Sequence, residues 1–482
     1  MQKRKVVLGV ASTRREIFST EEAIRYKNLL LEKLKNFDVE IVDIEDINEE
    51  GLLFEEEHVA PVVKKFKDAN VDGIFCPHTN FGTEYLVAKV AKQVGKPVLI
   101  WGPRDDAPLE NGVRSRDTQC GLFATGKVLR RFHVPFTYLV NCSMEDSRFT
   151  EGLSDFLAVC AVVKAFRKIR ILQISTRPAP FWTMIVNEGE LLEKFGIEIV
   201  PLNMSELIGK VKQEKEVKGG YYAEAKEKLQ RIDCSVFDKS DGLETVAALN
   251  SVIKKYCAEL DCSAVCIQCW TQMQEEIGIM PCLSNGLLFE EGIPCVCETD
   301  IHGAISAIMV QEALLCTSPV FFADLTVRHP CNDNAELLWH CGNFPYTLAK
   351  KPDEAKADRH FVFPTHKPGT ADWELKKGDI TVCRFDGDNG NYSLFLGEGK
   401  AVDGPKTLGT YVWLETPDWE AWEHKLVTGP YVHHCACVYG KISAVLYEAC
   451  KYIPGLTPDP VTPGKEEIEY YLIHGTPEKE DR

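Results

Sequence analysis

The sequence lacks the two features that would tie the protein to a membrane or to a nucleic acid. No run among its 482 residues approaches the roughly 18–20 consecutive apolar residues that a membrane-spanning helix needs. Positive charge is also scarce, because 55 Lys and Arg stand against 72 Asp and Glu, a formal net charge of −17. A chain this acidic repels phosphate backbones. We therefore expect neither a nucleic acid nor a membrane among its partners.

Three common cofactor and catalytic signatures are missing as well. The chain has no Gly-x-Gly-x-x-Gly after a predicted strand, no Gly-x-x-x-x-Gly-Lys-Ser/Thr and no Gly-x-Ser-x-Gly. These absences argue against a nucleotide cofactor and against a serine hydrolase. The apolar run 6–11 is too short for the core of a signal peptide, and no small-residue cleavage site follows it. We expect a cytoplasmic protein.

Cysteine, in contrast, is abundant. The chain contains 19 cysteines, an odd number that excludes complete pairing, and many stand in apolar runs. In a reducing compartment such residues serve as small buried hydrophobes. Cys266 and Cys269 have the spacing of half a zinc site, but no second pair of this kind occurs. The sequence favours structural thiols without disulfides, and a metal knuckle is the alternative.

The order of apolar runs predicts two α/β domains. In the first 165 residues, short apolar runs alternate with amphipathic stretches of helical length, which is typical of βαβ units around a parallel sheet. The pattern restarts near Lys168 and predicts a second doubly wound unit. The expected strands of the first unit are 6–11, 39–42, 73–76 and 97–101, and those of the second are 169–174, 198–201, 263–268 and 294–297.

The character of the sequence changes after Pro345. Strand-like runs at 380–385, 392–397 and 410–414 are separated by glycine and Asp-Gly turns, and one clear helix is expected at 442–452. The predicted fold is α/β, with two doubly wound parallel-sheet domains and a smaller β-rich C-terminal domain. The expected domain ranges are 1–165, 166–345 and 346–482.

Polar side chains at the ends of predicted strands are the candidates for ligand binding. Open α/β sheets bind ligands at the carboxyl ends of their strands. Arg14 follows the first strand of the first unit, and His78 and Asn80 follow another. Gln268 and Trp270 occupy the corresponding position in the second unit. An ordinary place in a loop is the alternative for each of them.

Metal-binding side chains occur in two further places. Glu298 and Asp300 follow a predicted strand, and because strand side chains alternate we expect both carboxylates to point the same way. Asp300 also suits the N-cap of the next helix, so capping is its alternative role. His433 and His434 are adjacent and point in different directions, so at most one of them is expected to be a ligand. Carboxylates with one imidazole form the set expected for Mn²⁺, Co²⁺ or Mg²⁺.

These stretches resemble those of a known family. Glu298-Thr299-Asp300 and His434-Cys435-Ala436-x-x-Tyr439-Gly440, each followed by a helix, resemble the metal-binding stretches of L-fucose isomerases. The run 77–84 resembles a substrate-side loop of the same proteins. The chain is identified as a member of the L-fucose isomerase/L-arabinose isomerase family. The resemblance implies a metal-dependent aldose–ketose isomerase, an intramolecular oxidoreductase that acts on open-chain L-fucose, D-arabinose or a related or substituted aldose.

The resemblance also implies a metal site and an assembly. It implies Mn²⁺, with Co²⁺ or Mg²⁺ as alternatives, held by a glutamate, an aspartate and a histidine. Asp300 and His434 match the last two. The family's glutamate precedes the aspartate, which points to Glu276, with Glu275 or Glu298 as substitutes. The family assembles as homo-oligomers, so a hexamer or a trimer is expected, in which the N-terminal domain of one subunit helps to close the active site of a neighbour.

The expected reaction explains why these residue types are needed. Moving a carbonyl from C1 to C2 takes a proton from C2 and returns it to C1 through an enediolate, whose oxygens carry negative charge. A divalent cation stabilises that charge as a Lewis acid. A nearby carboxylate can carry the proton. We expect Glu276 and Asp300 to do this acid–base work, and we expect the sugar to contact Arg14, His78, Asn80, Gln268 and Trp270.

Two other functions remain open. A non-catalytic sugar-binding or sensor protein also has two α/β lobes, but it needs neither a metal nor paired carboxylates. A metal-dependent aldolase needs both, and only the family resemblance argues against it. Metal analysis together with an aldose/ketose exchange assay separates the three possibilities.

Overall fold

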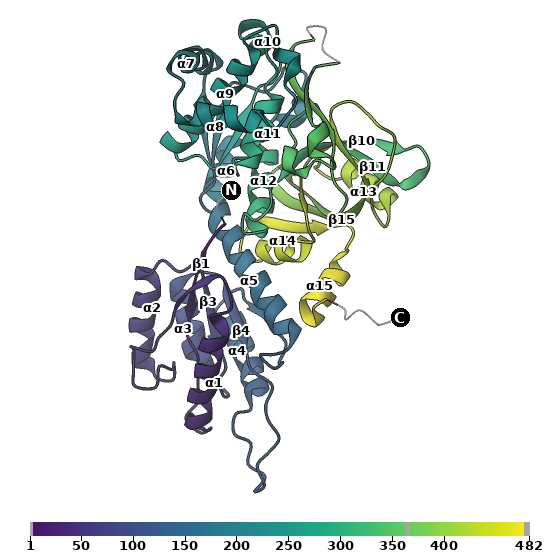
Figure 1. Ribbon diagram of the computed structural model, residues 1–482. Helices are drawn as coiled ribbons and strands as arrows, with labels where there is room; N and C mark the ends of the chain where they lie inside the picture. Colours follow the sequence, from purple (N-terminus) through teal and green to yellow (C-terminus); the bar gives the residue numbers. More distant parts are fainter. Residues whose placement is uncertain (1–2, 362–365, 477–482) are drawn as a thin grey trace. The chain divides into compact units, whose positions relative to one another are not determined.

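The structure is a computed structural model that describes residues 3–361 and 366–476 (Figure 1). It separates into two compact units. The N-terminal unit consists of Arg4–Lys164, Tyr447–Ile453 and the chain from Glu466 onward. The large unit is built from Ala165–Leu446 and Pro454–Lys465. Within the described ranges, no helix is both long and apolar enough to cross a membrane.

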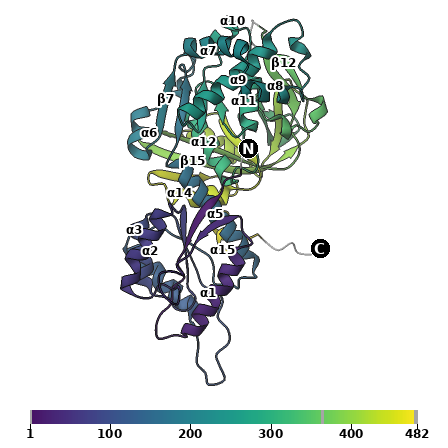
Figure 2. The same cartoon turned by 60° about the vertical axis from the view of Figure 1, so that its left-hand side comes forward.

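The N-terminal unit contains a five-stranded parallel sheet with the order β2-β1-β3-β4-β5. Figure 2 shows this sheet with helices on either side of it. The strands are β1 (Val6–Val10), β2 (Val39–Val42), β3 (Gly73–Pro77), β4 (Val98–Trp101) and β5 (Thr137–Tyr138). The helices are α1 (Thr20–Leu34), η1 (Glu56–His58), α2 (Val59–Asp68), α3 (Glu84–Val94), α4 (Thr118–Arg131), α5 (Ser147–Phe166) and, near the C-terminus, α15 (Lys465–His474).

Helices cover both faces of this sheet. Phe66 of α2 lies against Gly9 of β1, and Cys160 of α5 lies against Gly73 of β3, with no room for a side chain at either glycine. Gly9 pairs with the residue after Gly73, so the two glycines face opposite sides of the sheet. The arrangement is doubly wound, as the sequence predicted.

The large unit begins with a four-stranded parallel sheet in the order β7-β6-β8-β9. Its strands are β6 (Arg170–Ile174), β7 (Glu198–Leu202), β8 (Ala264–Ile267) and β9 (Cys295–Val296). Its helices are η2 (Trp182–Met184), α6 (Glu188–Phe195), α7 (Met204–Val217), α8 (Gly220–Leu229), η3 (Ser235–Phe237), α9 (Gly242–Glu259), α10 (Gln272–Glu276), α11 (Cys282–Glu290) and α12 (Ile301–Ala313). Gly196 ends α6 with φ 72°, a conformation that glycine adopts without strain.

The rest of the large unit is a nine-stranded mixed sheet with the order β12-β13-β16-β11-β10-β17-β14-β15-β18. An additional pairing of β15 with β16 closes six of these strands into a ring. The strands are β10 (Phe321–His329), β11 (Asn332–His340), β12 (Lys356–Arg359), β13 (Pro368–Glu374), β14 (Asp379–Asp388), β15 (Asn391–Val402), β16 (Thr410–Glu415), β17 (His434–Tyr439) and β18 (Leu456–Pro460). The helices are η4 (Tyr346–Leu348), η5 (Pro352–Glu354), α13 (Trp419–Thr428) and α14 (Ser443–Cys450).

The two sheets of the large unit share one hydrophobic core. Ile174 and Val265 of the parallel sheet belong to the same buried cluster as Phe321, Val382 and Leu414 of the mixed sheet. Helix α12 contacts β8 on one side and β14 and β17 on the other. The N-terminus of α12 therefore lies where the two sheets meet.

The predicted fold class is confirmed: the chain has two parallel-sheet α/β parts and a β-rich part. The β-rich part begins earlier than residue 346, because β10 and β11 already belong to the mixed sheet. The division into three domains stays a prediction, since the structure separates into two units and the parallel and mixed sheets of the large unit share a core.

Candidate active site

His434 lies at the centre of a polar cluster in the large unit. It is the first residue of β17, and β17 pairs with β10 so that His434 stands directly opposite Asp324. Side chains of directly paired residues lie on the same face of a sheet. His434 is 1% exposed, and its Nε2 atom lies 3.4 Å from Asp324 Oδ1.

Asp300 binds the other nitrogen of this histidine. Its Oδ2 atom lies 2.9 Å from His434 Nδ1 and also accepts a hydrogen bond from Arg384. Its Oδ1 atom accepts the backbone N–H of Gly303 at 2.8 Å and so caps helix α12. The capping role considered from the sequence is therefore present, and the same carboxylate also orients His434.

Glu298 reaches His434 from a turn rather than from a strand. The strand β9 ends at Val296, and Glu298 and Thr299 adopt left-handed conformations with φ of 53° and 58°. This corrects the expectation that an extended strand points Glu298 and Asp300 the same way. Glu298 Oε2 lies 3.8 Å from His434 Nε2, whereas Asp300 contacts Nδ1. Such strained conformations of residues other than glycine gather at functional sites.

Three atoms thus face one another: Glu298 Oε2 and Asp324 Oδ1 both lie within ion-pair distance of His434 Nε2. We call them the 298–324–434 cluster. Both carboxylate oxygens are buried and accept no hydrogen bond from any residue of the described chain. A buried anionic oxygen without a partner is costly. Among the described residues, the ligand atoms of Asp324, His433 and His434 lie within 4.8 Å of one another, and those of Glu298 lie equally close to Cys269 and Cys297. Two carboxylate oxygens and an imidazole nitrogen are ligand types that a divalent cation such as Mn²⁺ accepts, so the chemistry of these residues fits the implied metal.

Burial and neighbouring charges shift the pKa values of Glu298, Asp300 and His434. Burial raises the pKa of Glu298 well above its usual range, and the neighbouring Cys269 adds to this. Burial also opposes ionisation of Asp300, but Arg384 and His434 prevail and hold the pKa of Asp300 below its ordinary value. Burial lowers the pKa of His434, yet the hydrogen bond with Asp300 and the nearby carboxylates raise this pKa to about 9. A cation that binds here must therefore displace the protons held by Glu298 and His434.

A second network holds Asp300 in place. Arg384 donates from Nε to Asp386 Oδ2 at 2.8 Å and pairs with Asp300 through Nη1. Asp386 in turn contacts His302 Nδ1 at 2.8 Å. All four side chains are buried, so this chain of charges is fixed before any ligand binds.

The structure places Glu276 apart from this cluster. It is exposed on α10 and accepts a hydrogen bond from Gln272 at 2.7 Å, and the neighbouring Glu275 is exposed as well. Among the described residues, no recorded interaction joins either glutamate to His434. The substitute named from the sequence, Glu298, is the glutamate that the fold brings to the histidine.

The predicted sugar contacts of the large unit lie at the end of β8. Gln268 accepts a hydrogen bond from Ser175 Oγ at 2.7 Å. The Trp270 ring packs edge-on against Phe181, with their ring centres 5.1 Å apart. Both residues are partly exposed, and β8 ends at Ile267, so Gln268 follows the strand that the sequence predicted to include it.

The remaining predicted contacts lie in the N-terminal unit. Arg14 binds Glu50 through Nε at 2.5 Å and through Nη2 at 2.7 Å, and its Nη1 atom is buried without a hydrogen bond among the described residues. His78 uses Nδ1 to bind the Phe81 carbonyl at 2.9 Å, which leaves its Nε2 atom buried and without such a partner. Asn80 instead binds the backbone of Arg15 and so shapes the loop.

The sequence analysis missed Asp324 and Arg384. Asp324 follows the apolar run 320–323, the same signal that drew attention to Glu298. Arg384 stands inside an apolar run, where a charge needs a buried partner. Each residue thus carried a local signal in the sequence. The residues that explain Asp324 and the Asp300 partner of Arg384 lie far away along the chain, so the signals were not interpreted.

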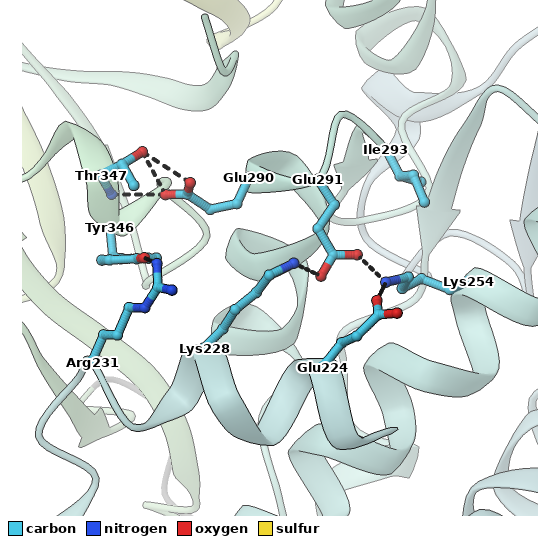
Figure 3. Close-up of a pocket in the computed structure, with 9 residues that line it drawn as sticks. All are labelled: Glu224, Lys228, Arg231, Lys254, Glu290, Glu291, Ile293, Tyr346 and Thr347. Atoms are coloured by element: carbon cyan, nitrogen blue, oxygen red, sulfur yellow. Dashed lines mark hydrogen bonds and ion pairs between the residues drawn. The ribbon is translucent and has the colours of Figure 1, made fainter. Parts of the chain in front are cut away.

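A separate polar hollow of about 380 Å³ lies between α8, α9 and α11 (Figure 3). Its charged side chains pair with one another: Glu291 binds both Lys228 and Lys254, and Arg231 donates to the Tyr346 hydroxyl. Because these charges are already neutralised locally, the hollow offers a ligand little, and the 298–324–434 cluster is the better candidate site.

Comparison with known families identifies the family of the chain. The sequence profile of the N-terminal domain of fucose/sulfoquinovose isomerases matches residues 9–167, and that of the L-fucose isomerase C-terminal domain matches residues 338–454. Together these profiles cover more than half of the chain. The protein belongs to the fucose isomerase-like family, and the prediction that it is an aldose–ketose isomerase is confirmed at the level of this class.

Its curated relatives carry one particular name within that family. The sulfoquinovose isomerase of Priestia megaterium is 26% identical over 442 residues, which cover 90% of this chain and 94% of the relative. The sulfoquinovose isomerase of Alkalicoccus urumqiensis is 28% identical over 347 residues, which cover 71% of this chain and 75% of the relative.

One solved structure gives a weak match. A periplasmic solute-binding protein of Actinobacillus succinogenes with bound D-allose is 13% identical and covers 64% of this chain and 92% of its own, with a TM-score of 0.15. A TM-score this low supports neither a fold nor a function.

Proposed function

We propose that the protein interconverts a sulfonated hexose and its ketose, with sulfoquinovose, the sugar in its relatives' names, as the first substrate to test. The observation that carries the proposal is the 298–324–434 cluster: two buried carboxylate oxygens that accept no hydrogen bond lie within ion-pair distance of one imidazole nitrogen. A metal-dependent aldose–ketose isomerase needs a cation site of this kind, whereas a sugar-binding protein does not.

We further propose that Glu298, Asp324 and His434 hold Mn²⁺. This replaces Glu276 with Glu298, and it gives Asp300 the task of orienting His434 through Nδ1. A carboxylate behind a metal-binding histidine fixes the ring and leaves the other nitrogen free for the ion. Asp300 already uses both oxygens, on Gly303, Arg384 and His434, which argues against a direct role as a ligand.

The bound cation would supply Lewis acidity at the sugar oxygens. The chain's own carboxylates would move the proton. Asp324 is the least enclosed member of the cluster, with a side chain 17% exposed, whereas Glu298 is 8% exposed. A base must reach the sugar carbons, so Asp324 is the better candidate to carry the proton between C2 and C1. Asp324 thereby takes over the acid–base role that the sequence gave to Glu276 and Asp300.

The direct test is turnover of candidate sugars by the purified protein. Sulfoquinovose, L-fucose and D-arabinose are each incubated with metal-stripped enzyme, with and without added Mn²⁺, and ketose formation is followed by NMR. We expect Mn²⁺-dependent conversion of sulfoquinovose with the highest kcat/KM of the three. In D₂O, deuterium in the product would show proton transfer rather than a hydride shift.

Other outcomes would contradict this proposal. Sugar binding without turnover would indicate a binding protein, and release of shorter carbon fragments would indicate an aldolase. Full activity after complete removal of divalent cations would reject the metal. A cytoplasmic location and a homo-oligomer, as a hexamer or a trimer, remain predictions, and sedimentation analysis together with activity over a dilution series checks the second.

A further inference from the structure

His340 is a buried histidine close to the 298–324–434 cluster that no role yet explains. It ends β11 and is 2% exposed. Its ring centre lies 6.4 Å from that of Phe322, and Phe322 in turn packs edge-on against His434. The charges of Asp324 and His434 both act on the pKa of His340, which burial lowers to about 4. His340 is therefore a neighbour of the cluster.

The contacts of His340 determine which nitrogen carries its proton. The backbone N–H of Cys341 points at Nδ1 from 2.9 Å, and the Cys341 thiol lies 3.3 Å from the same atom. A ring nitrogen that accepts an N–H has no proton of its own, so in a neutral imidazole the proton is on Nε2. The local backbone thus sets the tautomer of His340.

The Nε2–H group has no partner. This atom is buried and makes no hydrogen bond to any residue in the described ranges. A buried donor left without an acceptor costs stability, and proteins keep such groups mainly where a ligand completes them.

We propose that His340 donates a hydrogen bond from Nε2 to an oxygen of the bound sugar and stabilises the negative charge that develops there during isomerisation. The inference deepens the proposed function and rests on it. An imidazole with a fixed Nε2–H can stabilise an oxyanion without losing its proton. His340 is not a fourth metal ligand, because a protonated nitrogen cannot bind a cation and Nδ1 is already an acceptor for Cys341.

Two amide variants separate this role from a structural one. In His340→Asn the amide group occupies the place of Nδ1, so it can still accept the Cys341 N–H but has no donor at the position of Nε2. In His340→Gln the amide nitrogen reaches the position of Nε2. We expect His340→Asn to lower kcat by about 10²–10³-fold, as for removal of one oxyanion donor. His340→Gln should recover at least about a tenth of the wild-type kcat, because it restores the donor.

Binding measurements provide a readout other than turnover. A substrate-derived hydroxamate imitates the charged enediolate, and the corresponding sugar alcohol imitates the neutral ground state. His340→Asn should weaken hydroxamate binding by at least about tenfold more than sugar-alcohol binding, because the donor faces the developing charge. Mn²⁺ content, measured on the same samples, should stay at the wild-type level in both variants.

Several results would overturn the inference. Wild-type kcat in His340→Asn would show that the donor is not used, and equal losses in the two variants would show that its position does not matter. Loss of Mn²⁺ from His340→Asn would make it a ligand or a structural residue. If the wild-type protein isomerises none of the sugars, the proposed function fails first, and that result is distinguishable from all of these.

Discussion

Buried polar atoms without a hydrogen bond occur in both units, and two sets of them at the predicted site residues differ in chemistry. In the N-terminal unit, Arg14 Nη1 is a donor, and His78 Nε2 becomes an acceptor once Nδ1 donates to the Phe81 carbonyl. In the large unit, the spare atoms of Glu298 and Asp324 are both acceptors, and both belong to acidic groups. Mixed donors and acceptors suit sugar hydroxyls, whereas acidic acceptors alone suit a cation. The comparison supports a sugar-facing edge in one unit and a metal site in the other.

The largest expected effect on metal binding and activity comes from substitution of Glu298, one of the two acidic acceptors of the large unit. Glu298→Gln should lose Mn²⁺ and lower kcat/KM by at least about 10³-fold, because it removes a ligand charge. Glu276→Gln makes the same chemical change on exposed α10 and should keep both properties. Metal analysis and sugar turnover, measured on both variants, provide the contrast. Loss of metal from the Glu276 variant alone would restore the assignment made from the sequence.

The adjacent histidines offer a second contrast at the same site. His434→Gln should abolish metal retention, because Nε2 of this buried ring faces Glu298 and Asp324. His433 is exposed, and His433→Gln should retain the ion. Metal content after gel filtration checks both variants. Retention of stoichiometric metal by the His434 variant would reject the site.

Asp300 should show an intermediate effect. Asp300→Asn keeps the shape of the side chain but removes the charge that orients His434 and pairs with Arg384. Loss of a carboxylate behind a metal-binding histidine typically weakens metal affinity by about 10–100-fold. Titration with Mn²⁺ under a competing chelator measures this change. Complete loss of binding would indicate that Asp300 is itself a ligand, and an unchanged affinity would remove it from the site.

Substitution of Arg14, the buried donor of the N-terminal unit, should weaken substrate binding and leave metal binding unchanged. Arg14→Lys keeps a positive charge for Glu50 but loses the planar group that leaves Nη1 free. We expect KM for the sugar to rise by about tenfold, the loss of roughly one charged hydrogen bond, with Mn²⁺ content unchanged. Steady-state kinetics measures this, with Arg25→Lys as the control because Arg25 is exposed and pairs with Glu22. An unchanged KM would leave Arg14 as a structural residue.

The smallest effect concerns the thiols. None of the 19 cysteines, all of which lie in the described ranges, forms a disulfide, and of these only Cys120 and Cys331 are exposed. Alkylation of the native protein should therefore modify these two first and leave activity intact, since neither belongs to the cluster. Mass spectrometry after denaturation without reductant should find all 19 thiols reactive. Early loss of Cys269, which donates to Glu298 at 3.0 Å, would show that the cluster is open.

Local patterns were reliable wherever neighbouring residues decide the structure. Strand β2 matches its predicted bounds, because a short apolar run between amphipathic stretches is a local signal. Strands β10 and β11 were not predicted, although they carry Asp324 and His340. Strand β17 is buried almost throughout and rich in small residues, so it shows no alternation of polar and apolar positions.

The sequence by itself determined the fold class and the family and singled out His434 as a candidate, because these depend on short patterns along the chain. It also placed Glu298 among the candidates. Only the tertiary structure decided which acids meet His434. Asp324 reaches it through strand pairing between β10 and β17, and the left-handed turn at Glu298 brings that carboxylate round to Nε2. Strand pairing between distant segments leaves no local mark in the sequence, since the interaction energy arises only when the core brings them together.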